Sequence, residues 1–224
     1  MQRKFPLAVG YAYHIFSRSI ANFIIFNNSS DYQRMLMLLC YFQIKDPPTK
    51  FSYFIRNKNT KNSDFSQIFN PLVKNQPKIV QLIGYCLMPT HIHLIIKQTT
   101  NQGISIYLSN VLNSYARYFN TRHKRKGPLW EGRFKNVFIE NDEQLLHLTR
   151  YIHLNPVTSS LVKKPEDWQF SSYLEYIEDK NTLGFCSYKN AIGITPEEYQ
   201  KFVEERADYQ KELGKIKKLY ANMI

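Results

Sequence analysis

Residues 88–97 read MPTHIHLIIK, an apolar run that carries two histidines separated by one isoleucine. Successive side chains of a β-strand point to opposite faces. His91 and His93 are therefore expected on one face of a strand, with Ile92 on the other. Such a pair is either two satisfied polar side chains on a half-exposed face or part of a metal site, because neutral imidazole is the commonest metal ligand in proteins. The pair by itself leaves both interpretations open.

Flanking patterns extend this strand into a sheet. Residues 80–88 form a second apolar run, and a Pro-Thr turn separates it from the histidine run, which predicts an antiparallel hairpin. Residues 11–17 (YAYHIFS) and 133–140 (RFKNVFIE) have the aromatic content or the alternation that is typical of strands. Residues 45–78 are polar and broken by prolines, so they are interpreted as an insertion or a long connection.

Helical spacing links the predicted strands. One helix is expected after Asp31, a residue type that suits an N-cap, and a second over residues 104–123, where apolar residues recur at helical intervals. A third helix is expected after Asn141 and is expected to end at Pro156. A charged helix is expected from Pro196 onward. This order of elements predicts an α+β fold in which helices back an antiparallel sheet.

The composition favours a polyanionic partner. The 224 residues include 30 Lys and Arg against 18 Asp and Glu, a formal charge of +12, and 16 Tyr and 15 Phe add many aromatic rings. Apolar residues make up 43%, which excludes a disordered chain. Cations neutralise phosphates and rings stack on unpaired bases, so nucleic acid is the expected ligand. A basic surface that only aids solubility is the alternative.

The cysteines and the hydropathy pattern bear on location. Cys40, Cys86 and Cys186 form no CxxC pair and no disulfide framework. No stretch approaches the roughly 20 consecutive apolar residues that span a bilayer. A cytoplasmic protein without a membrane anchor is therefore expected.

A basic and aromatic stretch begins in the second predicted helix. Between residues 111 and 136 only Glu131 opposes seven cations, and favourable charge at a helix C-terminus explains two or three cations rather than seven. The stretch is therefore expected to bind DNA. The predicted contacts are Arg117, Arg122, Lys124, Arg125, Lys126, Trp130, Arg133 and Lys135, together with Arg18 after the first strand. For Arg18 a surface salt bridge is an equal alternative.

The third predicted helix ends in RYIHLNP, where Tyr151 and Asn155 are four residues apart and share a helix face. Each has an ordinary interpretation, since Tyr151 can pack in the core and Asn155 can stop the helix before proline. A phenol is a weak nucleophile at neutral pH. It becomes effective where a divalent cation activates a phosphodiester and stabilises its leaving group. Tyr151 is therefore a candidate nucleophile only if a metal lies near it.

Taken together, these segments resemble the single-tyrosine HUH transposases, and most closely the REP-associated tyrosine transposases among them. The matching segments are YHIFSRS, CLMPTHIHLIIK, SYARYFNTRHKRKGPLWEGRFKNVFIE, LLHLTRYIHLNPV and DWQFSSYLEY, in that order. They cover most of residues 11–176 apart from the insertion. The HxH pair alone is unspecific, whereas its combination with GPLWEGRFK and RYIxxNPV is highly specific.

The resemblance implies a ferredoxin-like antiparallel sheet with the HUH motif on a central strand and the catalytic tyrosine on a following helix. It implies that His91, His93 and Asn155 bind Mg²⁺ or Mn²⁺ and that Tyr151 is the nucleophile. The implied reaction is the cleavage and rejoining of single-stranded, hairpin-forming DNA through a 5′-phosphotyrosine.

The same resemblance implies a transposase domain over residues 1–176, followed by a helical extension over 177–224. Both a monomer and a homodimer remain open. One alternative function is a domesticated protein that binds hairpin DNA or RNA without cleaving it, and another is a metal-dependent phosphodiesterase that uses water. His14 receives no role, because a histidine within a strand can be a core residue. His147, one turn before Tyr151, is expected not to contact the site.

Overall fold

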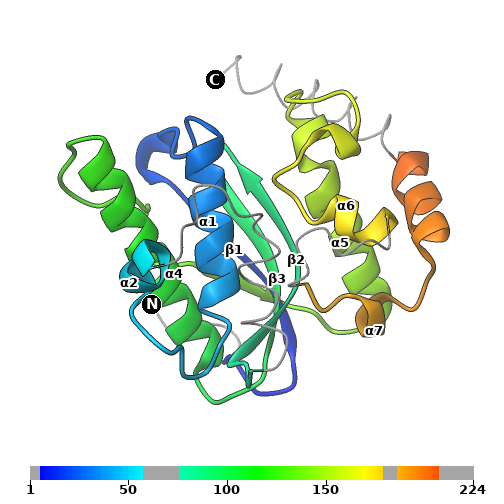
Figure 1. The fold of residues 1–224 in the computed structure, drawn as a ribbon. Coiled ribbons are helices and arrows are strands. Elements are labelled where there is room, and N and C mark those ends of the chain that lie inside the picture. Colours follow the sequence, from blue (N-terminus) through cyan, green and yellow to red (C-terminus); the bar gives the residue numbers. More distant parts are fainter. Residues whose placement is uncertain (1–5, 58–75, 179–185, 207–224) are drawn as a thin grey trace.

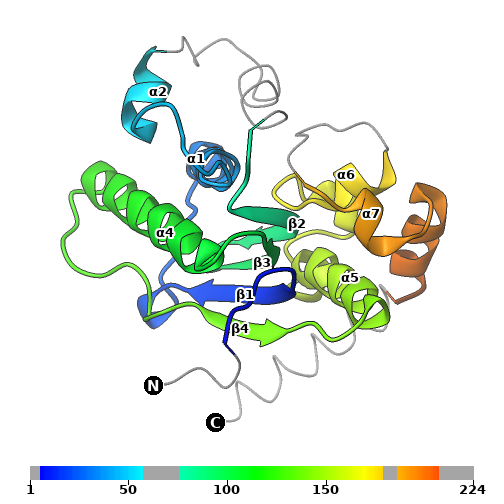
Figure 2. The same cartoon turned by 90° about the horizontal axis from the view of Figure 1, so that it is seen from below.

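The computed structural model describes residues 6–57, 76–178 and 186–206. Four antiparallel strands form one sheet in the order β2-β3-β1-β4 (Figures 1 and 2). β3 lies between β2 and β1, so the histidine run is on a central strand. The predicted α+β fold with an antiparallel, helix-backed sheet is confirmed. The strands are β1 (Ala12–Arg18), β2 (Val80–Met88), β3 (His91–Gln98) and β4 (Lys135–Phe138).

Helices cover both faces of this sheet (Figure 1). α1 (Ser29–Tyr41) and α4 (Gly103–Arg122) pack on one face, and α5 (Asp142–Thr158) packs on the other. Alternation along β3 sends Ile92 and Leu94 into the core under α1 and α4, and Ile95 into the core under α5. His91 and His93 alternate in step with Ile95, so they face the α5 side.

Two helix boundaries differ from the sequence expectation. The N-cap of α1 is Asn28, whose side chain accepts a hydrogen bond from the backbone N–H of Asp31 at 3.3 Å. Asp31 lies instead in the first turn, where its carboxylate complements the helix dipole. α5 continues through Pro156 for two more residues. A proline in the last turn removes only one hydrogen bond of the helix, and the ring of Pro156 is buried. Asn155 is thus a helical residue rather than a helix stop.

Shorter helices complete the described chain, and none of the helices described is long and apolar enough to cross a bilayer. His153 of α5 contacts two of them, the helix over residues 196–206 and the start of α6 (Tyr173–Ile177). Its Nδ1 lies 2.7 Å from the hydroxyl of Tyr199, and its Nε2 lies 2.7 Å from the hydroxyl of Ser172. The shorter elements are η1 (Ile20–Asn22), α2 (Phe51–Asn57), η2 (Pro165–Asp167), α6 (Tyr173–Ile177) and α7 (Lys189–Ile192), and residues 196–206 are also helical.

The insertion and the C-terminal extension are described in part. Residues 58–75 of the insertion lie outside the described residues, while α2 sends Phe51 and Phe54 into the core beneath α1. Tyr199 and Val203 of the extension share a core with α5 and β2. The domain boundary at residue 176 stays a prediction.

Candidate active site

The two histidines of β3 lie side by side on the face that α5 covers. Their ring centroids are 5.0 Å apart and their planes meet at 85°. Burial, with a smaller contribution from the charge of Arg18, lowers the pKa of His91 to about 4. Burial and the neighbouring charges of His91 and His14 also lower the pKa of His93. Both imidazoles are therefore neutral at pH 7, which is the form that binds a metal ion.

Each histidine of the pair has its Nδ1 atom engaged. Nδ1 of His91 lies 3.0 Å from the hydroxyl of Thr90, and Nδ1 of His93 lies 3.0 Å from Nε2 of His14. His14 belongs to β1 and is 8% exposed, and its ring lies edge to edge with that of His93, with centroids 5.2 Å apart and planes 18° apart. The hydrogen bonds among the described residues thus leave both Nε2 atoms of the pair open. Two rings that share one ion through N–metal bonds of about 2.1 Å lie about 5 Å apart, so this pair fits a divalent cation.

α5 brings Tyr151 to this pair. The helix begins at an Asn141 cap, whose side chain accepts from the backbone N–H of Gln144 at 2.8 Å. Ile152 of α5 packs into the core, and Tyr151 beside it lies at the margin of the histidine face. The ring of Tyr151 is 5.9 Å from that of His93, centroid to centroid, and its side chain is 45% exposed. A phenol in this position is both near the histidines and open to a large ligand.

Asn155 lies one turn beyond Tyr151 and is half-buried. Its side-chain Nδ2 donates to the backbone oxygen of Tyr151 at 3.3 Å. That bond leaves the amide oxygen of Asn155 as its available ligand atom. No group of three or more His, Cys, Asp and Glu side chains within the described ranges could hold a metal ion. The predicted ligand set contains only two such residues, His91 and His93, because its third member is an asparagine. The role of Asn155 therefore stays a prediction.

The predicted DNA contacts do not form one surface. Arg18 is the cross-strand partner of His91, and Lys135 is the partner of Phe16, with its Nζ 6.0 Å from that ring. Directly paired residues of antiparallel strands point to the same face. Both cations therefore border the histidine face. Arg18 forms no ion pair with a carboxylate among the described residues, so the salt-bridge alternative has no support there.

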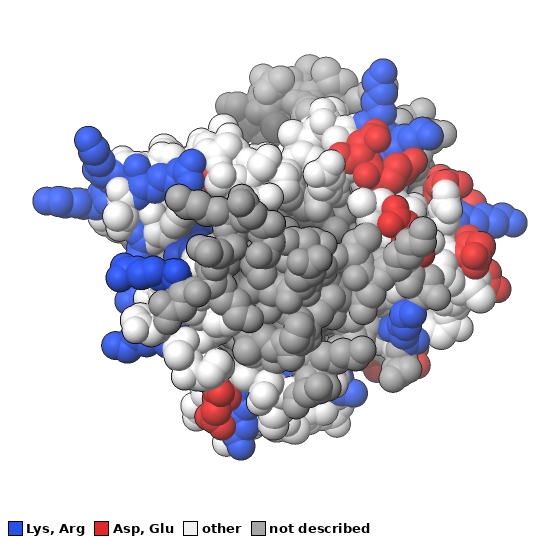
Figure 3. All heavy atoms as spheres, in the orientation of Figure 1, with Lys and Arg blue, Asp and Glu red and all other residues white. Residues whose placement is uncertain are grey.

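The remaining predicted contacts lie on or after α4. Arg117 and Arg122 are on the helix, and Lys124 and Lys126 are exposed in the following loop. Figure 3 shows Lys and Arg gathered on the left, where Figure 1 has α2 and α4, and Asp and Glu mainly over the C-terminal helices. Arg133 lines a separate hollow of about 410 Å³.

Two of the predicted contacts donate hydrogen bonds within the protein. The guanidinium of Arg125 donates to the backbone oxygen of Pro128 at 2.7 Å and to the side chain of Asn120 at 3.1 Å, which closes the loop after α4. The indole N–H of Trp130 donates to the backbone oxygen of Leu112 at 3.0 Å. These bonds give both side chains a structural role in the described chain.

His14 is the residue that sequence reasoning missed. The register that aligns Phe16 with His93 places His14 beside it across the strand pair, and the sequence does not contain that register. Its strand pattern, YHIFS, shows only that His14 and Phe16 share a face. His147, in contrast, lies away from the pair, with its ring 5.4 Å from that of Phe202.

Comparisons with known proteins agree with the sequence motifs. The model of a family described as "Transposase IS200 like" matches residues 49–155, a range that includes His91, His93, Tyr151 and Asn155. The chain resembles the IS200-like transposases. A curated protein of Haemophilus influenzae with the name "Putative REP-associated tyrosine transposase" is 25% identical over 121 residues, which is 50% of this chain and 68% of that protein.

The fold also has a solved counterpart. A REP-associated tyrosine transposase bound to a REP hairpin superposes with a TM-score of 0.53 at 16% identity, covering 80% of this chain and 86% of that one. At this identity the likeness concerns the fold. The predicted resemblance to the transposase family is thus confirmed by the family model, the curated relative and the fold together.

Proposed function

We infer that this transposase relative nicks and rejoins single-stranded DNA, with Tyr151 as the nucleophile of a 5′-phosphotyrosine intermediate. The observation that carries the inference is the contact between Tyr151 and His93, 5.9 Å apart between ring centroids, on a half-exposed helix face. The family model covers His91, His93, Tyr151 and Asn155, and it supports the same activity.

The chemical step conserves the phosphodiester. The Tyr151 oxygen forms a bond to phosphorus while the bond from phosphorus to the 3′-oxygen breaks. The phenolic proton passes to solvent, and the departing 3′-oxygen takes up a proton to become a 3′-hydroxyl. The DNA then remains joined to Tyr151 through its 5′-phosphate. A 3′-hydroxyl can attack that ester and reverse the step, so strand transfer needs no further energy source.

The proposed cofactor is Mg²⁺ or Mn²⁺, held by Nε2 of His91, Nε2 of His93 and the amide oxygen of Asn155. When bound, the cation polarises the scissile phosphate and stabilises the negative charge that develops on the 3′-oxygen. The protein's part is to keep these donor atoms aimed at one point. The Nδ1 bonds to Thr90 and His14 support this arrangement, because a ligand histidine is oriented by a partner on its other nitrogen.

His14 is proposed as a positioning residue for His93. If Nε2 of His93 binds the cation, its Nδ1 carries the proton and donates to Nε2 of His14. The 3.0 Å separation of the two nitrogens is that of a hydrogen bond, and binding of a cation by Nε2 of His93 would fix its direction. Arg18, opposite His91 on β1, is proposed to contact the scissile phosphate. A hairpin-forming strand is the proposed substrate, by analogy with the solved relative bound to a REP hairpin.

Covalent trapping tests the proposed function. The full chain is incubated with a 5′-labelled or 3′-labelled single-stranded hairpin and Mn²⁺, and the products are separated on a denaturing gel. A protein-linked band is expected with the 3′-labelled strand, because the fragment downstream of the cut stays on Tyr151. Tyr151→Phe should remove the band, and Tyr11→Phe, an equal change at an exposed tyrosine outside the site, should keep it.

Two results would decide between the alternatives. If the strand is cleaved without forming an adduct, and this cleavage persists in Tyr151→Phe, the protein is a phosphodiesterase that uses water. Tight hairpin binding without cleavage in Mg²⁺ or Mn²⁺ would indicate a binding protein. Loss of the adduct on changing another tyrosine instead would overturn the assignment of Tyr151.

A further inference from the structure

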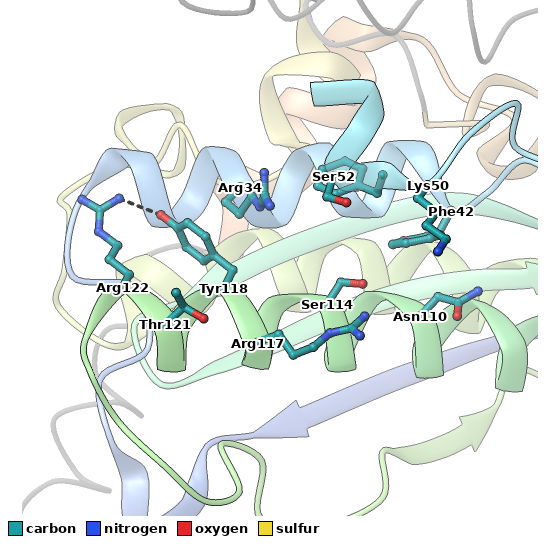
Figure 4. A pocket seen from close by; sticks show the side chains of 11 residues that line it. Arg34, Phe42, Lys50, Ser52, Asn110, Ser114, Arg117, Tyr118, Thr121 and Arg122 are labelled. Carbon is teal, nitrogen blue, oxygen red and sulfur yellow. Dashed lines mark hydrogen bonds between the residues drawn. The ribbon is translucent and has the colours of Figure 1, made fainter. Parts of the chain in front are cut away.

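A second candidate ligand site lies on the other side of the sheet. α1, α2 and α4 enclose a groove of about 900 Å³, referred to below as the α1–α4 groove (Figure 4). Its volume is within the range of ligand sites. The described residues that line it include no Asp or Glu and four cations, which are Arg34, Lys50, Arg117 and Arg122.

Arg34 is the most unusual of these cations. Its guanidinium carbon lies 4.6 Å from the ring centre of Phe51 and 5.0 Å from that of Tyr118. Its Nε is buried and has no hydrogen-bond partner among the described residues. Burial also lowers the pKa of Arg34, which reports the cost of removing this charge from water. A cation held in this way gains from an anionic ligand that supplies both charge and acceptors.

The other cations of the groove differ in how far they are neutralised. Within the described ranges, Arg117 and Lys50 have no carboxylate within ion-pair distance. Arg122 donates to the hydroxyl of Tyr118 at 2.7 Å, and its Nε is 3.9 Å from the buried carboxylate of Asp31. The groove therefore has a net positive charge that the described side chains do not balance.

The arrangement of these groups favours a strand of nucleic acid over a single anion. Lys50 and Asn110 stand at one end of the groove and Arg122 at the other, with Arg34 and Arg117 between them (Figure 4). The charge continues past the end of α4 into the exposed Lys124 and Lys126. Cations spaced along a groove follow a phosphate backbone, and half-buried rings such as those of Phe42 and Tyr118 offer surface to unpaired bases.

We propose that the α1–α4 groove binds a single-stranded segment of DNA that flanks the cleaved site. The groove and Tyr151 are on opposite sides of the sheet, since α1 and α4 cover one face and α5 the other. The segment in the groove is therefore a different part of the DNA from the scissile phosphodiester. This inference takes its ligand class from the proposed function, but the groove can be tested without any cleavage.

The test measures the binding of a fluorescent oligo(dT) of about 20 nucleotides by anisotropy. The full chain carries Tyr151→Phe and the buffer contains EDTA, so neither cleavage nor metal contributes. Replacing Arg34 and Arg117 together by Gln should weaken binding by about tenfold or more and reduce the slope of log K against log salt by about 1.4, the value for two lost contacts to a single strand. Arg56→Gln with Lys163→Gln removes the same charge from exposed sites outside the groove and should change affinity by less than about threefold.

Two further measurements separate the inference from its rivals. Lys50→Gln changes an exposed side chain, so a weaker affinity in this variant does not arise from misfolding. Photocrosslinking of a strand that contains 4-thiothymidine should label peptides of α1, α2 or α4. Equal affinity of the double variant and its parent would overturn the proposal, as would stronger binding of a blunt duplex than of oligo(dT). Loss of labelled ATP binding with unchanged oligo(dT) binding would also overturn it, in favour of a free nucleotide.

These outcomes are independent of the proposed nicking activity. A protein that forms no adduct with any strand, yet loses oligo(dT) binding in the groove variants, would contradict the proposed function and keep the groove. A protein that forms the adduct, but whose groove variants bind oligo(dT) with unchanged affinity, would keep the proposed function and contradict the groove.

Discussion

The two faces of the sheet carry different chemistry. The α5 face holds three neutral, largely buried imidazoles, with a half-exposed tyrosine at its margin. The α1–α4 side holds permanently charged guanidinium and ammonium groups among aromatic rings. Neutral nitrogen donors suit a cation, and fixed cations suit a phosphate backbone. If both proposals hold, one small fold binds a strand on one side of its sheet and cleaves it on the other.

The largest effect that distinguishes the two faces is expected for His93→Ala. Without this proposed metal ligand, adduct formation in Mn²⁺ should fall on the order of 10³-fold, because the proposed stabilisation of the leaving oxygen would be lost. Binding of oligo(dT) in EDTA should stay within about twofold, because the groove is on the other face. His147→Ala, a matched change on α5 beside Phe202, should keep the adduct. An active His93→Ala protein would show that the histidine face is not the reaction centre.

The second prediction concerns the layer that supports the α5 face. Glu175 of α6 is 1% exposed, and burial raises the pKa of its carboxyl from about 4.5 to about 7. Between these values the unfolded chain has released the proton while the folded protein keeps it. The contribution of this carboxyl to the free energy of unfolding is therefore fully present below about pH 4.5 and is lost as pH rises toward 7. The total loss is on the order of 3 kcal/mol.

Urea unfolding at pH 5 and pH 8 measures this effect. Glu175→Gln stays neutral and should lack this loss. From pH 5 to pH 8, the free energy of unfolding of the variant should therefore rise relative to that of its parent. Equal loss in both proteins would show that the buried carboxyl does not titrate in this window. The groove variant Lys50→Gln should follow its parent at both pH values, since its side chain is exposed.

The third prediction sharpens the role of His14. His14→Phe keeps a ring but removes the partner of His93 Nδ1, so Mn²⁺ affinity should fall about 10- to 100-fold. His14→Gln retains an acceptor and should recover part of that affinity. Electron paramagnetic resonance of free and bound Mn²⁺ provides the measurement without DNA or turnover. Unchanged affinity in His14→Phe, with the fold intact by circular dichroism, would reduce His14 to a packing residue.

The smallest expected effect is that of Arg18→Gln. A charge-assisted contact to one phosphate predicts a loss of about three- to tenfold in the rate of adduct formation. Mn²⁺ affinity should not fall, because removing a positive charge near His91 eases cation binding. A drop in metal affinity instead would mean that Arg18 orders the histidine pair rather than the DNA.

Local pattern was sufficient for much of the fold. Apolar runs and a Pro-Thr turn predicted β2 and β3 within one residue of their observed bounds. The errors came where one residue has two roles. Pro156 ends a helix in most contexts, but here it lies in the last turn, where its missing N–H removes only one hydrogen bond of the helix, and its ring is buried. Asp31 suits an N-cap, yet Asn28 three residues earlier takes that position.

The sequence by itself determined which side chains share a face. The two-residue period of a strand put His91 with His93, and the helical period put Tyr151 with Asn155. The tertiary structure decided which faces meet. Strand register brought His14 to His93 across 79 residues of chain, and helix packing placed Arg34 of α1 opposite Arg117 of α4. The same packing divided one basic stretch between two sides of the sheet. Periodicity is a local property of the backbone, whereas contacts between faces depend on register and on the layers that burial of the apolar side chains selects.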